Sequence, residues 1–132
     1  MVNQFGDGES KKCSYVTQFE HIKRMLLNNE HKPDLNEVIM TLGHGVKAIE
    51  AVPAALFSFL FNVDTCFEDT ILYAISLGGD TDTIASMTGA IAGAYWGEQH
   101  IPDEWLVASE SVDEVLKFAN ELYDLQYSKD IV

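Results

Sequence analysis

One stretch of the chain, within residues 46–63, is apolar on every side of a helix, and it constrains the fold more than any other feature. Its apolar members are Ala54, Leu56, Phe57, Phe59, Leu60 and Phe61. A helix that presents no polar face to water has to be covered by other parts of the protein. Pro53 either kinks this helix or begins its second part. We therefore predict that this helix is buried.

Helical spacing of apolar residues recurs along the rest of the chain, and the alternation typical of strands persists nowhere. Capping boxes, in which Ser or Thr precedes Glu by three residues, mark several helix starts, and glycines mark several ends. The expected starts are the capping boxes at Thr17, Thr65 and Ser111, then Asp34 after Pro33, Asp80, and Pro102. These signals predict an all-α, bundle-like domain of about six or seven helices with short connections.

The 132 residues fit one domain or a piece of a larger one. Residues 1–12 are polar and show no periodicity, so we expect a disordered lead-in. The predicted domain covers residues 13–127, and residues 128–132 form a tail. The most apolar stretches are shorter than the roughly 20 residues that span a bilayer, so no membrane association is expected.

The charge and cysteine content narrow the class of protein further. A net charge of −13 argues against binding nucleic acid or an anionic membrane through a general basic surface. The two cysteines lie far apart in the sequence and form no metal-binding spacing with the histidines. We interpret Cys66 as a core residue and Cys13 as lying near a flexible end. This usage favours a reducing, intracellular compartment.

The segment Gly78-Gly79-Asp80-Thr81-Asp82-Thr83 carries the most chemistry in the chain. Because Asp80 is expected at a helix start, its carboxylate, that of Asp82 and the Thr83 hydroxyl can converge in front of the first turn. Oxygen ligands packed this densely suit a hard cation such as Mg²⁺. A doubly acidic helix cap without a metal is the alternative. An EF-hand is disfavoured because its turn glycine and bidentate glutamate are absent.

The helix that follows is rich in small residues. Gly89 and Gly93 lie in its interior, where glycine costs roughly 0.5–1 kcal/mol relative to alanine. They therefore predict very close contact with neighbouring helices, which would hold the Asp80–Thr83 turn rigid.

The stretches 77–85 and 89–97, together with 42–46 and 50–54, resemble the ADP-ribosylglycohydrolase family. The resemblance covers roughly residues 15–123 and is strongest to the branch that removes ADP-ribose from serine and degrades poly(ADP-ribose) in the DNA damage response. It implies an all-α fold and a site with two Mg²⁺ ions. It further implies that Asp80, Asp82 and Thr83 are metal ligands, that Asp82 bridges both ions, and that Asp80 orients or deprotonates the attacking water.

The same resemblance implies that His44, Gly45 and Val46 line the substrate pocket beside the adenosine or ribose. The family usually has Asn where His44 stands, so we expect the contact to run through the backbone or apolar atoms of Gly45 or Val46. The implied partner is an ADP-ribose-containing substrate. The implied location is the nucleus, cytoplasm or mitochondrion.

A Thr-Asp-Asp ligand run and a catalytic glutamate on a mobile loop belong to the other half of the family fold, and we find neither in this sequence. The chain is therefore expected to be the C-terminal portion of a Mg²⁺-dependent hydrolase, supplying half of a two-metal site. We expect it to be nearly inactive without the N-terminal half as a partner. A non-enzymatic, truncated or degenerate helical interaction module is the alternative.

Overall fold

The computed structural model describes residues 14–28 and 30–127. Within these ranges the chain forms α-helices and one 3₁₀ helix and no strand, which confirms the all-α class for this part of the protein. The elements are α1 (Tyr15–Leu27), α2 (Leu35–Leu42), α3 (Ala48–Phe61), α4 (Phe67–Ser76), α5 (Thr81–Trp96), η1 (Glu98–His100), α6 (Asp103–Ala108) and α7 (Val112–Tyr127). The predicted lead-in 1–12, Cys13 and the tail 128–132 lie outside the described residues.

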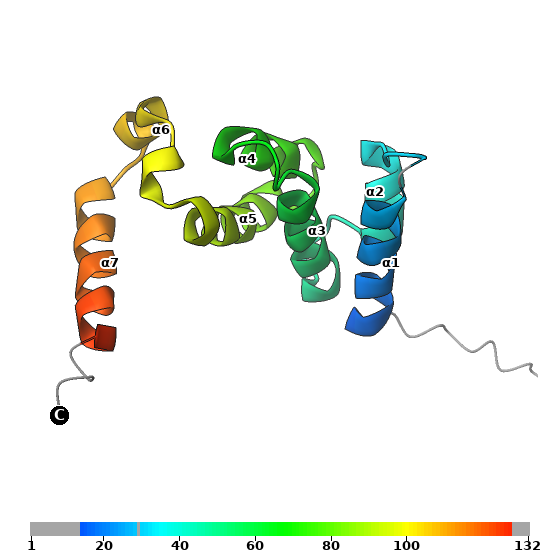
Figure 1. The fold of residues 1–132 in the computed structure, drawn as a ribbon, viewed down its shortest axis with the longest axis horizontal. Helices are drawn as coiled ribbons and strands as arrows, with labels where there is room; N and C mark the ends of the chain where they lie inside the picture. Colours follow the sequence, from blue (N-terminus) through cyan, green and yellow to red (C-terminus); the bar gives the residue numbers. More distant parts are fainter. Residues whose placement is uncertain (1–13, 29, 128–132) are drawn as a thin grey trace, which may run out of the picture. The chain divides into compact units, whose positions relative to one another are not determined.

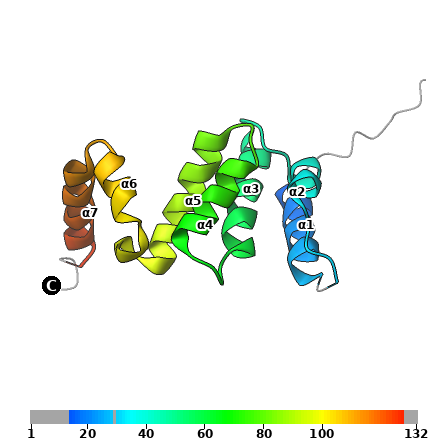
Figure 2. The ribbon, with the colours of Figure 1, turned by 90° about the horizontal axis from the view of Figure 1, so that it is seen from above.

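The chain divides into two compact units, one that ends at His100 and one that begins at Ile101. In the first unit, α3 lies between the α1–α2 pair and the α4–α5 pair (Figures 1 and 2). Ala54, Phe57 and Ser58 of α3 are fully buried, which confirms the predicted burial of this helix. Pro53 lies inside α3, which is one continuous helix, so it does not begin a separate segment.

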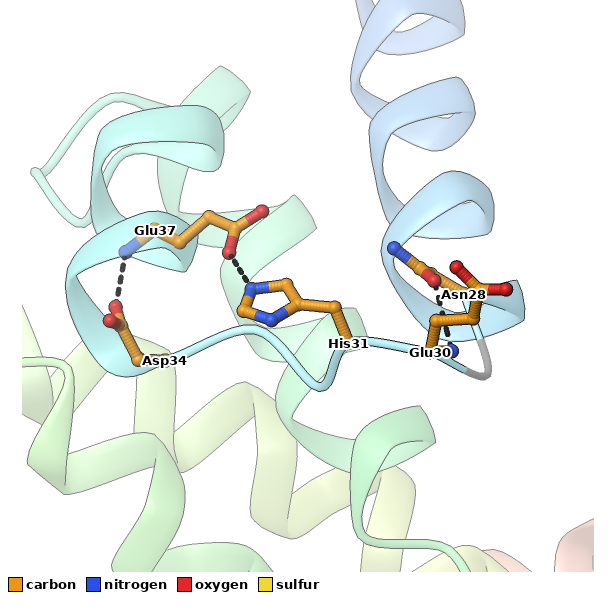
Figure 3. Close-up of polar contacts among 5 residues, drawn as sticks. All are labelled: Asn28, Glu30, His31, Asp34 and Glu37. Carbon is orange, nitrogen blue, oxygen red and sulfur yellow. Dashed lines mark hydrogen bonds and ion pairs between the residues drawn. The ribbon is translucent and has the colours of Figure 1, made fainter.

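Helix α2 begins as the sequence predicts. The Asp34 carboxylate accepts a hydrogen bond from the backbone N–H of Glu37 at 2.8 Å. The Glu37 carboxylate in turn meets His31 Nε2 at 2.9 Å, and all three side chains lie on the surface (Figure 3). Figure 3 also shows Asn28 at the end of α1, whose side-chain oxygen accepts the N–H of Glu30 at 3.1 Å.

Two predicted helix caps are wrong by a few residues. The cap of α1 is Ser14, whose hydroxyl accepts the N–H of Thr17 at 3.3 Å. The cap of α4 is Cys66, whose sulfur accepts the N–H of Asp69 at 3.4 Å, whereas the Thr65 hydroxyl donates to a preceding carbonyl. The N-cap is the residue whose backbone is still extended, and both Ser14 and Cys66 are extended.

The interpretation of Cys66 as a core residue is also wrong, because its side chain is exposed. A thiol can accept a weak hydrogen bond, and at this position it does so at the surface end of α4.

The second unit contains α6 and α7. Pro102 caps α6, and α7 begins directly after Ser111, as predicted. Apolar residues recur along α7 at helical spacing but are exposed, with Val115 at 62% and Leu122 at 68%. None of the described helices combines the length and the apolar character needed to cross a membrane.

Candidate functional site

Residues 77–80 form a sharp turn between α4 and α5, which we call the diglycine turn. Gly78 and Gly79 have φ of +70° and +66°, in the left-handed region that residues with a Cβ atom rarely adopt. A Cβ atom on Gly79 would also overlap the carbonyl oxygen of His44. Leu77, at the start of the turn, is 2% exposed and anchors it in the core. Both glycines are therefore required by the backbone path that leads into α5.

The two aspartates of the motif meet at the N-terminus of α5. Asp80 occupies the N-cap position, but its side chain makes no capping hydrogen bond. The backbone N–H of Thr83 lowers the pKa of the Asp82 carboxyl, and a side-chain hydrogen bond with Asp80 lowers it further. The Asp80 and Asp82 carboxyl groups are therefore neighbours, whereas the convergence of the Thr83 hydroxyl with them stays a prediction. Their role as metal ligands remains a prediction.

The oxygen atoms at the start of α5 suit a hard cation, but the number of possible ligands is small. Asp80, Asp82 and Thr83 offer only oxygen atoms, the ligand type that Mg²⁺ prefers. Across residues 14–28 and 30–127, no group of three or more His, Cys, Asp or Glu side chains is placed to hold a metal. Since Mg²⁺ takes about six oxygen ligands, this turn can supply only part of a coordination shell.

The glycines inside α5 do not mark close helix contacts, so that prediction is wrong. A Cβ atom on Gly89 would meet Ile71 at 3.5 Å, an ordinary van der Waals distance. A Cβ atom on Gly93 would meet nothing within 4 Å. The turn that leads into α5 is, in contrast, in close contact with another part of the chain.

Those contacts come from residues 43–47, the loop that joins α2 to α3, which we call the 43–47 loop. Glu50 of α3 accepts the backbone N–H of Gly45 at 3.1 Å and lies against Gly43, whose φ is +82°. Its other carboxylate oxygen lies 3.7 Å from the Lys47 ammonium. Val46, in the same loop, is 81% exposed. The loop therefore has a fixed backbone and an exposed apolar side chain.

Gln18 of α1 holds both ends of the 43–47 loop, a role that sequence reasoning missed. Its side-chain amide donates to the carbonyls of Leu42 at 3.0 Å and Ile49 at 3.1 Å. The Ile49 carbonyl lacks its usual helical partner because Pro53, four residues later, has no N–H. Gln18 is 3% exposed, so it pairs carbonyls that water could not easily reach. The proline inside α3 was a sequence signal that some distant donor would be needed.

His44 connects the 43–47 loop to the diglycine turn. Its Nδ1 lies 2.7 Å from the Leu77 carbonyl, and because a carbonyl only accepts, Nδ1 carries the proton. The His44 carbonyl accepts the N–H of Asp80 at 2.8 Å. The structure therefore places His44, a predicted substrate-binding residue, against Asp80, a predicted metal ligand. Gly45 and Val46 follow in the same loop, and their contact with substrate remains a prediction.

Three cavities lined by described residues lie away from Asp80 and Asp82. One of about 340 Å³ is apolar and lies between α1 and α3, with Phe19, Leu27 and Leu56 among its lining residues. A second, of about 350 Å³, is lined by Lys32 and Asp64 among others. A third, of about 540 Å³, lies within the second unit between α6 and α7. The acidic pair itself lies on an open surface, with Asp82 and Thr83 exposed.

Comparison with known proteins connects this geometry to a family. The family model described as ADP-ribosylglycohydrolase matches residues 3–131. ADP-ribosylhydrolase ARH3 of Danio rerio is 40% identical over 120 residues, which cover 84% of this chain and 32% of that protein. ARH3 of Gallus gallus is 44% identical over 98 residues, 67% of this chain and 27% of the relative. ADP-ribosylarginine hydrolase Tri1 of Serratia proteamaculans is 34% identical over 133 residues, 98% of this chain and 35% of the relative. The chain spans about a third of the length of these relatives.

Proposed function

The chain belongs to the ADP-ribosylglycohydrolase family, and on this basis we propose that it supplies one half of a Mg²⁺-dependent site that cleaves ADP-ribosyl O-glycosidic bonds. The observation that carries the proposal is the carboxyl pair of Asp80 and Asp82 at the start of α5, with Asp80 not engaged in capping the helix. An aspartate at an N-cap ordinarily uses its carboxylate on the helix. A carboxylate that leaves the helix uncapped and lies beside a second carboxylate is better explained by a ligand that both bind.

Asp80, Asp82 and the Thr83 hydroxyl would hold the cations. Two bound Mg²⁺ ions would supply Lewis-acid polarisation and would stabilise the negative charge that develops during cleavage. Asp80 would also orient a water molecule, or accept its proton, for attack at the anomeric carbon. The 43–47 loop would contact the ribose or adenosine through Gly45 and Val46.

The proposed substrate class is ADP-ribose attached through an oxygen atom, as in ADP-ribosyl-serine and poly(ADP-ribose). The ARH3 relatives at 40–44% identity support this branch. The name of the bacterial relative specifies ADP-ribosylarginine, so the arginine linkage is the competing substrate for the same site.

Complementation tests this proposal, because the chain offers only part of a coordination shell. The remaining part of the Danio rerio relative would be supplied as a second polypeptide. Release of ADP-ribose from serine- and arginine-modified peptides would then be measured with Mg²⁺ and with EDTA. We expect Mg²⁺-dependent release from the serine peptide. Asp80→Asn and Asp82→Asn should each reduce it by about 100-fold or more, because each removes charge from the metal site.

The matched control is Asp69→Asn, an exposed carboxylate in the first turn of α4. It should leave the release rate within about twofold, as expected for a surface substitution away from the site. Equal losses in all three variants would attribute the effect to helix stability instead of metal binding.

A non-enzymatic interaction module is the second candidate. The absence of any three-residue metal cluster among the described residues favours it, as do the exposed apolar residues of α7. Isothermal titration of the complemented protein with Mg²⁺ and ADP-ribose separates the two. Metal-dependent binding of ADP-ribose supports the hydrolase, and no binding under any condition supports the module.

A further inference from the structure

His44 bonds to both ends of the diglycine turn. Its Nδ1–H donates to the Leu77 carbonyl at 2.7 Å, and its own carbonyl accepts the Asp80 N–H at 2.8 Å. As the N-cap residue, Asp80 has a backbone N–H with no partner inside α5, so this bond satisfies an otherwise unpaired donor. One residue of the 43–47 loop therefore fixes the backbone on both sides of Gly78 and Gly79.

The diglycine turn depends on such contacts for a single conformation. Glycine loses more backbone freedom on folding than any other residue, and this turn contains two in succession. Both have positive φ, so neither glycine could be replaced by a stiffer residue. The space beside Gly79 is filled by the His44 carbonyl and ring, so the turn packs directly against the loop. The orientation of Asp80 is thus set by His44.

The 43–47 loop is itself held by side chains of α1 and α3. Gln18 donates to carbonyls at both of its ends, and Glu50 accepts the Gly45 N–H within it. Gln18 is almost fully buried, and Glu50 is partly buried. The backbone around His44 is therefore held at Leu42, Gly45 and Ile49, so that the turn and the loop are joined through His44.

The geometry points to His44 as a positioning residue that couples the 43–47 loop to the diglycine turn. A cation held by Asp80 and Asp82 would then change the environment of Gly45 and Val46, and a ligand on the loop would change the affinity of the turn for the cation. The identity of the two coupled ligands, a cation and a substrate, rests on the proposed function. The mechanical connection through His44 exists without any ligand and can be tested separately.

The first test measures amide hydrogen exchange by NMR on the metal-free chain. His44→Ala removes the bond to Leu77 without adding bulk. We expect exchange at the Asp80 amide to rise by about three- to tenfold, the change expected for the loss of one hydrogen bond. His44→Asn can still donate to the Leu77 carbonyl and should restore most of the protection. Exchange in the middle of α3, at Phe57, should stay unchanged in each variant, which excludes global unfolding.

The matched control is His100→Ala, an exposed histidine of η1 in the same unit. It should leave exchange at the Asp80 amide as in the wild type. If His44→Ala behaves like His100→Ala, or if His44→Asn fails to restore protection, His44 is not the positioning residue.

The second test titrates the same proteins with MgCl₂ alone after complementation with the remaining part of the Danio rerio relative, because this chain supplies only part of a coordination shell. In the wild type and in His44→Asn, the amide resonances of Gly45 and Val46 should shift together with those of Asp82 and Thr83. In His44→Ala, the resonances of Asp82 and Thr83 should still shift, with those of Gly45 and Val46 unchanged. Loop resonances that respond equally in His44→Ala would overturn the coupling. If no resonance responds in the wild type, the proposed metal role of this turn fails, and the exchange experiment alone decides the role of His44.

Discussion

Helices α2 and α5 both begin at an aspartate, and the two aspartates are used differently. Asp34 has ψ of 169°, and its carboxylate bonds to the N–H of Glu37. Asp80 has ψ of 60°, and its side chain makes no capping bond. At α5 the carboxyl of Asp82 accepts the N–H of Thr83 instead, which leaves the Asp80 carboxyl beside it.

The comparison separates a structural aspartate from a candidate ligand by backbone geometry. An extended N-cap lets its side chain reach the first free N–H groups, and Asp34 has that geometry. The diglycine turn places Asp80 in a different conformation, held by the His44 carbonyl. The start of α2 is therefore stabilised by its own cap, whereas the start of α5 is stabilised from outside. Five predictions test this contrast, from the largest expected effect to the smallest.

Gly79→Ala should produce the largest loss of stability. The new Cβ atom would overlap the His44 carbonyl at a positive φ, so we expect a loss of roughly 2–4 kcal/mol in the free energy of unfolding. Gly93→Ala is the control, because it adds a methyl group to open space inside α5 and should stabilise by roughly 0.5–1 kcal/mol. Urea denaturation measures both. If Gly79→Ala lost no more stability than a typical surface substitution does, the turn and the loop would not be packed together.

Gln18→Leu should give the second-largest loss of stability. It leaves the Leu42 and Ile49 carbonyls without their donor, which should cost roughly 1–3 kcal/mol. Adding Pro53→Ala returns an N–H to the Ile49 carbonyl, so the double variant should lose less than the sum of the two single changes. A double-mutant cycle measures this. Strict additivity would show that Gln18 does not compensate for the proline.

Asp34→Ala and Asp80→Ala test the contrast directly. Loss of the Asp34 cap should cost roughly 0.5–2 kcal/mol, since the Glu37 N–H loses its acceptor. Asp80→Ala should change stability by less than about 0.5 kcal/mol, because no capping bond is lost. Chemical denaturation of both variants gives the difference. Equal losses would mean that Asp80 serves α5 as Asp34 serves α2, which would weaken the metal proposal.

Tyr73→Phe extends the comparison, because the Asp34 charge also acts on this phenol. Burial first, and Asp34 second, raise the pKa of Tyr73 from 10.0 to about 12. A raised pKa in the folded state gives stability that is complete below pH 10 and is lost as pH rises toward 12. Tyr73→Phe should abolish this alkaline loss. Near neutral pH it should be neutral or stabilise by up to about 1 kcal/mol, because the buried hydroxyl has no hydrogen-bond partner among the described residues.

Unfolding measured between pH 9 and 12 against the wild type checks this prediction. An ultraviolet difference titration assigns the phenol. An unchanged alkaline transition in Tyr73→Phe would attribute the loss to another group.

Titration of Asp82 should have the smallest effect on stability, because its carboxyl is fully exposed to solvent. Its pKa lies below the usual 3.8, so its contribution to stability is present above that pH and is lost as pH falls through the folded value. Asp80→Ala should move the pKa of Asp82 only part of the way back, since the Thr83 N–H is the larger cause. An NMR titration of the Asp82 carboxyl measures the shift. A complete return would mean that Asp80 is the dominant influence.

Local patterns predicted the helices and the buried α3 well, because period and capping act over a few residues. They misplaced the caps of α1 and α4, where a neighbouring Ser or Cys has the extended backbone that decides the cap. They also misread the glycines of α5, since a small residue in a helix indicates close packing only if a neighbour is present.

The site was predictable only in its local part. The convergence of Asp80 with Asp82 follows from their position at a helix start. The contacts from His44 to Leu77 and from Gln18 to Leu42 join residues 33 and 24 positions apart. Periodicity carries no information about which elements face one another at that distance. Pro53 indicated that the Ile49 carbonyl needed a donor, but it did not identify Gln18.

The contact between Gly79 and the carbonyl of His44 also bears on how freely this region can vary in sequence. Every residue has the same carbonyl, so that contact survives any replacement of the histidine side chain. Position 44 should therefore tolerate those amino acids that can still donate to Leu77, whereas position 79 should admit glycine alone. A saturation-mutagenesis screen of both codons would show one permissive site beside one that is nearly invariant.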